Sequence, residues 1–156
     1  MQPRIFQTLV VVLVLSCFYL GSVPVHAQSP EAKIGQKDTG FSYKTHKAGV
    51  WSIDFERKTL GKFKVIISTG ADVVVTFAIV AKKAHINMTW KLAEALLLAN
   101  HDYDYVKIGL DKDGDLFVRI DNQIRTTDVP EMKDTMNQVA NASEAVFVKV
   151  SGSIKR

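Results

Sequence analysis

The residues of this chain that are best suited to chemistry lie close together at His101, Asp102 and Asp104. An imidazole and two carboxylates are ligands of zinc and other transition metals, and paired carboxylates can act as general acid and base. With His46 or His85 as a further ligand, they would form the centre of a small metal-dependent hydrolase. Short polar motifs at the end of a helix more often have no ligand. The sequence therefore favours a non-enzymatic role and keeps the hydrolase as the alternative.

A second acidic run, Asp111 to Asp115, contains three aspartates and could suggest a calcium loop. An EF-hand loop requires glycine at its sixth position and glutamate at its twelfth. Here Gly114 is fourth and Asn122 is twelfth, so the run is interpreted as a hairpin turn. No Ser-His-Asp order, glycine-rich phosphate loop or Cys-His pair is recognisable. We expect no cofactor.

A third group, formed by Phe117, Arg119 and Arg125, points to protein binding. Phe117 and Arg119 alternate with apolar residues and are expected on the opposite face of a strand. An aromatic residue with arginines on an exposed sheet face has the composition of a protein-binding surface. The alternative is that Arg119 pairs with a carboxylate, such as Asp121 or Glu144.

These residues are expected on a helix and the hairpin that follows it. The helix spans residues 89–100, and it carries a wide apolar stripe at the helical period. The stripe consists of Leu92, Leu96 and Ala99, with Ala93 and Leu97 beside them. Asn100 is suited to end a helix. Residues 105–110 and 116–120 then alternate around Asp113-Gly114, which predicts a hairpin.

Elsewhere, period-two alternation predicts strands over residues 50–56 and 62–68. Residues 73–80 are apolar on both faces, which predicts a strand that is covered on both sides or that contacts a second copy. Residues 122–126 are expected to add a short strand. Asp128, with a proline and a glutamate soon after it, starts a final helix that runs to residue 147. The fold class is α+β, an antiparallel sheet with helices packed on one face, in the order βββα-ββ(β)α.

The N-terminus has the three-part plan of a secretory signal peptide over residues 1–27. A charge at Arg4 is followed by the apolar run 9–20 and a cleavage pattern that ends at Ala27. We expect export to the periplasm or the medium and no stable membrane insertion after cleavage. The alternative is an anchor formed by residues 5–20, although a spanning helix needs about 20 apolar residues.

The remaining chain is interpreted as one domain over residues 49–148, with a disordered leader over 28–48 and a frayed tail over 149–156. The net charge of the full sequence is +4, and the lysines are spread over expected strand exteriors and loops. A nucleic-acid-binding protein would concentrate them on one face. The charge pattern therefore gives no reason to expect a nucleic-acid partner.

Residues 88–147, and more loosely 50–147, resemble the YbjN-like and type III secretion chaperone-like group. The similarity is carried by an apolar helix that ends in a leucine pair and asparagine (Leu96, Leu97, Asn100), a hairpin with the turn Asp113-Gly114, an arginine-bearing strand, and a closing helix with NQVANASEAVF. The resemblance implies a small α/β sandwich, often dimeric, that binds protein segments and has no known chemistry. The expected function is therefore that of an exported, chaperone-like or regulatory module whose partner is another protein or a second copy.

Overall fold

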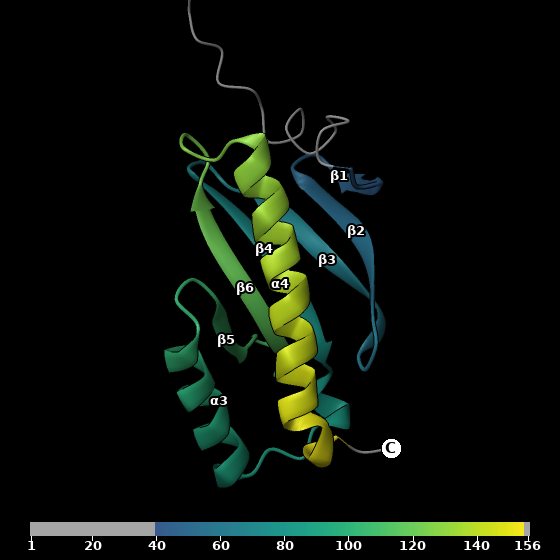
Figure 1. Ribbon diagram of the computed structural model, residues 1–156, viewed down its shortest axis with the longest axis vertical. Helices are drawn as coiled ribbons and strands as arrows, with labels where there is room; N and C mark the ends of the chain where they lie inside the picture. The colour runs from purple at the N-terminus through teal and green to yellow at the C-terminus, as the bar shows by residue number, and fades with distance from the viewer. Residues whose placement is uncertain (1–39, 155–156) are drawn as a thin grey trace, which may run out of the picture.

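The computed structural model describes residues 40–154, so the expected signal peptide and residues 28–39 lie outside the described part. Within it, six strands form one antiparallel sheet in the order β1-β2-β3-β4-β6-β5 (Figure 1). The strands are β1 (Tyr43–Lys47), β2 (Val50–Arg57), β3 (Gly61–Thr69), β4 (Val73–Ala81), β5 (Lys107–Leu110) and β6 (Leu116–Gln123). Two α-helices accompany the sheet, α3 (Trp90–Asp102) and α4 (Val129–Val150), together with two single turns of 3-10 helix, η3 (Lys83–His85) and η4 (Ser151–Ser153).

The core lies between one face of the sheet and α4, which crosses β4 and β6 in front of the sheet (Figure 1). Alternate residues of the four central strands point to this face, as the register Ile53↔Val65↔Ala78↔Val118 shows. All four are buried. From α4, Met132, Met136 and Val139 are buried against them. This packing confirms an α+β fold with its helices on one side of an antiparallel sheet.

Both α-helices begin where the residue types predict. The side chain of Thr89 accepts a hydrogen bond from the backbone N–H of Leu92 at 3.2 Å, and that of Asp128 accepts one from Glu131 at 2.8 Å. Each cap satisfies one of the backbone donors that a helix leaves unpaired at its start. No helix in residues 40–154 is long and apolar enough to cross a membrane.

Three details of the chain differ from the expectations. Residues 43–47 are not part of a disordered leader, because β1 pairs with β2 through its backbone although all its side chains are exposed. Residues 122–126 add no separate strand: β6 continues to Gln123, whose carbonyl then accepts hydrogen bonds from the N–H groups of Thr126 and Thr127 in a turn.

Residues 149–154 of the expected frayed tail are also ordered. Helix α4 continues to Val150, and Ile154 forms an isolated bridge with Ile86. The carbonyl of Ser153 accepts a hydrogen bond from the N–H of Asn87 at 2.9 Å. The C-terminal residues that the structure describes are therefore attached to the segment that leads into α3.

Candidate protein-binding face

The face of the sheet that points away from α4 is apolar at its centre. It carries side chains from β3, β4 and β6 that are only partly buried, and we call them the open face: Ile66, Val75, Phe77, Ile79 and Phe117. The register places them together, because Phe77 pairs with Ile66 on one side, and Ile79 pairs with Phe117 on the other. Neither α-helix lies over this face (Figure 1). Within residues 40–154, β4 is therefore apolar on both sides but covered on one.

Phe117 is placed on the open face by a glycine on the neighbouring strand. Gly109 pairs with Phe117 across β5 and β6, and a Cβ at this position would lie 3.0 Å from Cζ of the phenylalanine ring. The missing side chain lets the ring lie close over the backbone of β5. The position of this aromatic ring therefore depends on Gly109.

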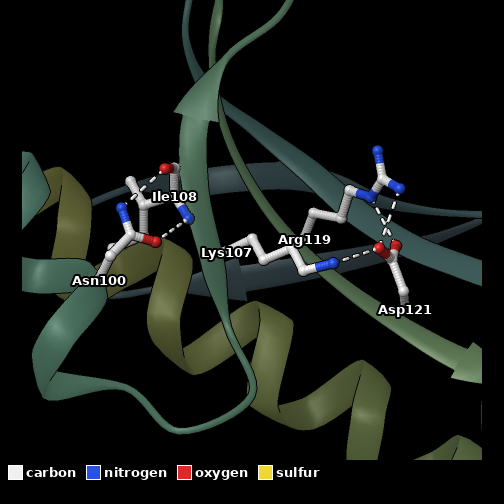
Figure 2. Close-up of polar contacts among 5 residues, drawn as sticks. All are labelled: Asn100, Lys107, Ile108, Arg119 and Asp121. Carbon is white, nitrogen blue, oxygen red and sulfur yellow. Dashed lines mark hydrogen bonds and ion pairs between the residues drawn. The ribbon is translucent and has the colours of Figure 1, made fainter.

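Arg119, two residues further on the same face, is paired rather than free (Figure 2). Its Nε donates to Oδ1 of Asp121 at 2.5 Å and its Nη2 donates to Oδ2 at 2.9 Å, while Nζ of Lys107 donates to the same Oδ2 at 2.7 Å. Burial would raise the pKa of Asp121, but these hydrogen bonds outweigh it and hold the pKa below its ordinary value. The alternative that Arg119 pairs with a carboxylate is confirmed, and the carboxylate is Asp121.

Glu144, the other carboxylate considered for Arg119, has a different role. Its two oxygens accept hydrogen bonds from the N–H groups of Thr59 and Leu60 at 2.8 and 2.7 Å. Burial would raise its pKa, but the two backbone donors hold it below its usual value. Glu144 thereby ties α4 to the turn between β2 and β3.

Arg125 lies apart from the other two predicted binding residues, because it follows the end of β6 in a turn. Its Nε donates to Oε1 of Gln123 at 3.0 Å. It borders a hollow of about 410 Å³ that it shares with Ala71 and Asp72 of the β3–β4 loop and with Val73, the first residue of β4. The structure therefore groups Phe117 with Arg119 and places Arg125 at the end of the sheet.

The residues considered for a metal site are not brought together. His101, Asp102 and Asp104 are all exposed at the end of α3, and Oδ2 of Asp102 lies 3.7 Å from Nζ of Lys149. His46 is on β1, where its Nε2 forms a hydrogen bond of 2.8 Å with Oγ of Ser52, and His85 belongs to η3. In the described part of the chain, no three His, Cys, Asp or Glu side chains are placed to hold a metal ion. The arrangement gives the hydrolase alternative no support.

The Asp111–Asp115 run forms a turn, as its glycine position predicts. Oδ1 of Asp111 accepts hydrogen bonds from the N–H groups of Asp113 and Asp115, both at 2.9 Å. Asp115 in turn accepts from Nζ of Lys82 at 2.6 Å and from the N–H of Lys83 at 2.9 Å, and these contacts lower its pKa. Gly114 adopts a φ of +83°, which suits glycine. Two of the three carboxylates are thus already used by the protein itself.

A second apolar surface was not predicted from the sequence. Trp90, Leu97 and Leu98 of α3 are 80%, 68% and 61% exposed, whereas Leu92, Leu96 and Ala99 are buried against β5 and α4. Leu97 therefore does not extend the buried stripe. The signal was the run of three leucines at 96–98, since three consecutive positions of a helix span much of its circumference. A helix with apolar residues on opposite sides needs a second contact.

Comparisons with known proteins support the fold. No family model matches the chain, and no curated protein shows significant sequence similarity to it. The structure of the heterodimeric ExoU–SpcU complex from the type III secretion system of Pseudomonas aeruginosa superposes with a TM-score of 0.51 and 11% identity, over 76% of this chain and 93% of that one.

Two further solved structures are similar at a TM-score of 0.49. The HopA1–SchA chaperone–effector complex matches with 14% identity over 69% of this chain and 80% of that chain. The Yersinia pestis type III secretion chaperone SycH, in complex with a fragment of YscM2, matches with 12% identity over 70% and 91%. The likeness to the ExoU–SpcU structure supports the fold that the resemblance in the sequence implies.

Proposed function

We propose that this chain is an exported, non-enzymatic module that binds a segment of another protein on the open face of its sheet. The observation that carries the proposal is β4, whose outward side chains Val75, Phe77 and Ile79 have no described layer over them. A sheet with two apolar faces is normally covered on both. The ExoU–SpcU structure, which has a similar fold, is that of a heterodimeric complex.

The charges beside the open face indicate the chemistry of the segment. Arg119 and Lys107 both contact the single carboxylate of Asp121, so this cluster has one positive charge in excess. It lies on the same face as Phe117, next to the apolar centre. A complementary segment is amphipathic: its apolar side covers Phe77 and Phe117, and an acidic side chain reaches Arg119 or Lys107.

Export is proposed from the pattern of residues 1–27 and is tested separately. The full chain is expressed in an exporting cell, and the protein from each fraction is analysed by mass spectrometry. We expect a product that begins near Gln28 outside the cytoplasm. A chain that keeps residues 1–27 and stays in the membrane fraction would support the anchor formed by residues 5–20 instead.

The binding proposal is tested by site-specific crosslinking in the same cell. A photo-reactive phenylalanine analogue replaces Phe117 in one variant and Val148, an exposed residue of α4, in the matched control. We expect one defined adduct at position 117 and none at 148, with the partner identified by mass spectrometry. Adducts of the same protein in equal yield at both positions would refute a specific face.

Purified partner then provides the quantitative test. Phe117→Ala and Phe77→Ala are each expected to weaken binding about tenfold or more. Each variant removes an aromatic ring that the partner would bury in the complex. Arg119→Glu is expected to weaken it as well, most strongly at low salt, because added salt screens the new repulsion of an acidic segment. Unchanged affinity in both phenylalanine variants, with the fold intact by circular dichroism, would place the partner elsewhere.

A further inference from the structure

We infer that a groove along one side of α4 binds an extended, basic segment of another protein. Two hollows form this α4 groove, one of about 340 Å³ beside the end of β6 and one of about 500 Å³ beside the corner between α3 and β5. Tyr105 and Gln138 line both hollows, so the two adjoin. The α4 groove lies on the helix side of the sheet and the open face lies on the other side, so neither proposal depends on the other.

One stripe of α4 forms a wall of the groove along its whole length. It consists of Glu131, Asp134, Gln138, Ala142 and Ala145, whose spacing of three or four residues places them on one side of the helix. From Glu131 to Ala145 the helix rises by about 21 Å, at about 1.5 Å per residue. About six residues of extended chain span the same length. The groove therefore has the dimensions of a short extended segment.

The edge of β6 beside the groove offers backbone groups to such a segment. β5 pairs with β6 from Leu116 to Arg119, whereas β6 continues to Gln123. In the described part of the chain, no strand pairs with β6 beyond Arg119 on the side away from β4, and Figure 1 shows this edge open toward the arrowhead of β6. Every second residue of a strand directs its N–H and C=O to a given side. Because Ile120 and Asn122 line the groove, a segment lying in it can add to the sheet.

The charges of the groove determine the chemistry of the segment. Five carboxylates line the two hollows, and no lysine or arginine does: Asp102, Asp104, Asp121, Glu131 and Asp134. Two of them already contact cations of the chain itself, because Asp121 pairs with Arg119 and Lys107, and Asp102 lies 3.7 Å from Lys149. The other three leave the groove with an excess of negative charge. A segment that carries lysine or arginine complements it.

Tyr105, between the two hollows, favours the same chemistry. Its side chain is 75% exposed, and a guanidinium or ammonium group binds well over the face of such a ring. Asp104 is its neighbour in the chain and supplies a carboxylate to the same hollow. On the facing wall, Ala142 and Ala145 are small and leave room for the aliphatic stem of a long basic side chain.

Other occupants fit the groove less well. An anionic membrane and a nucleic acid would both be repelled by its carboxylates. A metal ion would need several ligands around one point, and in residues 40–154 no three His, Cys, Asp or Glu side chains are placed in that way. A free polyamine would satisfy the charge but would leave the open edge of β6 without a partner. A basic polypeptide satisfies both.

The test is titration of the purified full chain into a fluorescent peptide of about seven residues, in which lysine or arginine alternates with valine. Anisotropy should show saturable binding, and a matched peptide with glutamate at the basic positions should not bind. Glu131→Gln combined with Asp134→Asn should raise the dissociation constant about fivefold or more. The matched control is Glu56→Gln, an exposed glutamate of β2, which should leave it unchanged. An equal dissociation constant in the groove variant and the control would overturn the proposal.

Backbone methylation separates strand addition from attraction between charges alone. A peptide with the same side chains and methylated backbone amides keeps its charge but loses the donors that would pair with β6. We expect it to bind about fivefold more weakly or less. Equal affinity of the two peptides would refute the added strand. Phe117→Ala should bind the unmethylated peptide as the unchanged chain does, and a loss of binding in this variant would place the peptide on the open face instead.

Three further measurements test the occupant itself. A photo-reactive phenylalanine analogue at Tyr105 should crosslink to the basic peptide, whereas the same analogue at Val148, exposed on α4, should not. Spermidine at the concentration of the peptide should not displace it, and displacement would show a general surface for cations. Sedimentation should give the same mass for the unchanged chain and the Glu131→Gln, Asp134→Asn variant. An oligomer that this variant dissociates would make a second copy the occupant and overturn the proposal.

Discussion

The side chain of Asn100 forms two hydrogen bonds with the backbone of Ile108, as a neighbouring strand would at the outer edge of β5. Its Oδ1 accepts from the N–H of Ile108 and its Nδ2 donates to the carbonyl of Ile108, both at 2.8 Å, while Nδ2 also reaches the carbonyl of Leu96 at 3.2 Å. An edge strand normally leaves such groups open to pairing with other chains. One amide side chain therefore satisfies both backbone groups of Ile108 at this edge and joins the last turn of α3 to β5.

Replacement of Asn100 by leucine should destabilise the fold markedly. The variant leaves the N–H and the carbonyl of Ile108 without their partner, and we expect a loss of about 2 kcal/mol in the free energy of unfolding. Urea denaturation followed by circular dichroism measures it. His101→Leu, one residue further and exposed, is the control and should change stability by less than about 0.5 kcal/mol. Equal stability of both variants would mean that the hydrogen bonds between Asn100 and Ile108 contribute nothing to the free energy of unfolding.

A methyl group at Gly109 should displace Phe117. Because the new Cβ would lie 3.0 Å from the ring, the ring must move by a few tenths of an ångström. We expect Gly109→Ala to lower stability by about 1 kcal/mol and to reduce crosslinking at the neighbouring residues of the open face. Gly152→Ala, where a Cβ meets no atom within 4 Å, is the matched control. Crosslinking as efficient as in the unchanged protein would show that the ring position is unimportant.

Asp115 should make stability depend on acid pH. Hydrogen bonds from Lys82 and Lys83 lower the pKa of Asp115 below its ordinary value of 3.8. A carboxyl group with a lowered pKa in the folded state contributes stability that is present above the unfolded pKa and is lost as pH falls through the folded pKa. Asp115→Asn should therefore be less stable than the unchanged chain at pH 7, and the difference should shrink below pH 3.8. Chemical denaturation at pH 7, 4 and 2.5 tests this, with Asp134→Asn as control. A constant difference across these pH values would contradict it.

The Glu144 side chain should stabilise the turn between β2 and β3 against local opening, without affecting the rest of the sheet. Its carboxylate holds the N–H groups of Thr59 and Leu60, so Glu144→Ala should speed hydrogen exchange at these two amides. Exchange in β4, at the centre of the sheet, should not change. Glu56→Ala, an exposed glutamate of β2, provides the comparison. Protection of both amides in Glu144→Ala would show that the turn holds without it.

Much of the fold can be predicted from local sequence patterns, each of which lies within a single helix, strand or turn. Residues close in sequence determine the turn at Asp113-Gly114, the caps at Thr89 and Asp128, and the alternation in β2 and β3. β1 was missed because its five side chains are all exposed, so its pairing with β2 rests on backbone hydrogen bonds that leave no hydrophobic pattern.

The candidate surfaces depend on which faces receive a covering layer, and this is a property of the whole chain. Period-two alternation correctly predicted that Phe117 and Arg119 lie on one face of a strand. The sequence of residues 73–80 likewise indicated that both faces of β4 are apolar. Neither pattern indicates that α4 covers a single side. The exposure of Leu97 was missed for a similar reason, because a wide helical stripe does not reveal where the neighbouring elements stop.

The bridge between Ile86 and Ile154 has a practical consequence for anyone who labels this molecule. Since the carbonyl of Ser153 holds the N–H of Asn87 just ahead of α3, a purification tag or fluorescent fusion at the carboxyl terminus adds mass beside that helix. Such a fusion would change how α3 meets its surroundings, so a cleavable handle or a label in the β3–β4 loop is the better choice for assays of association.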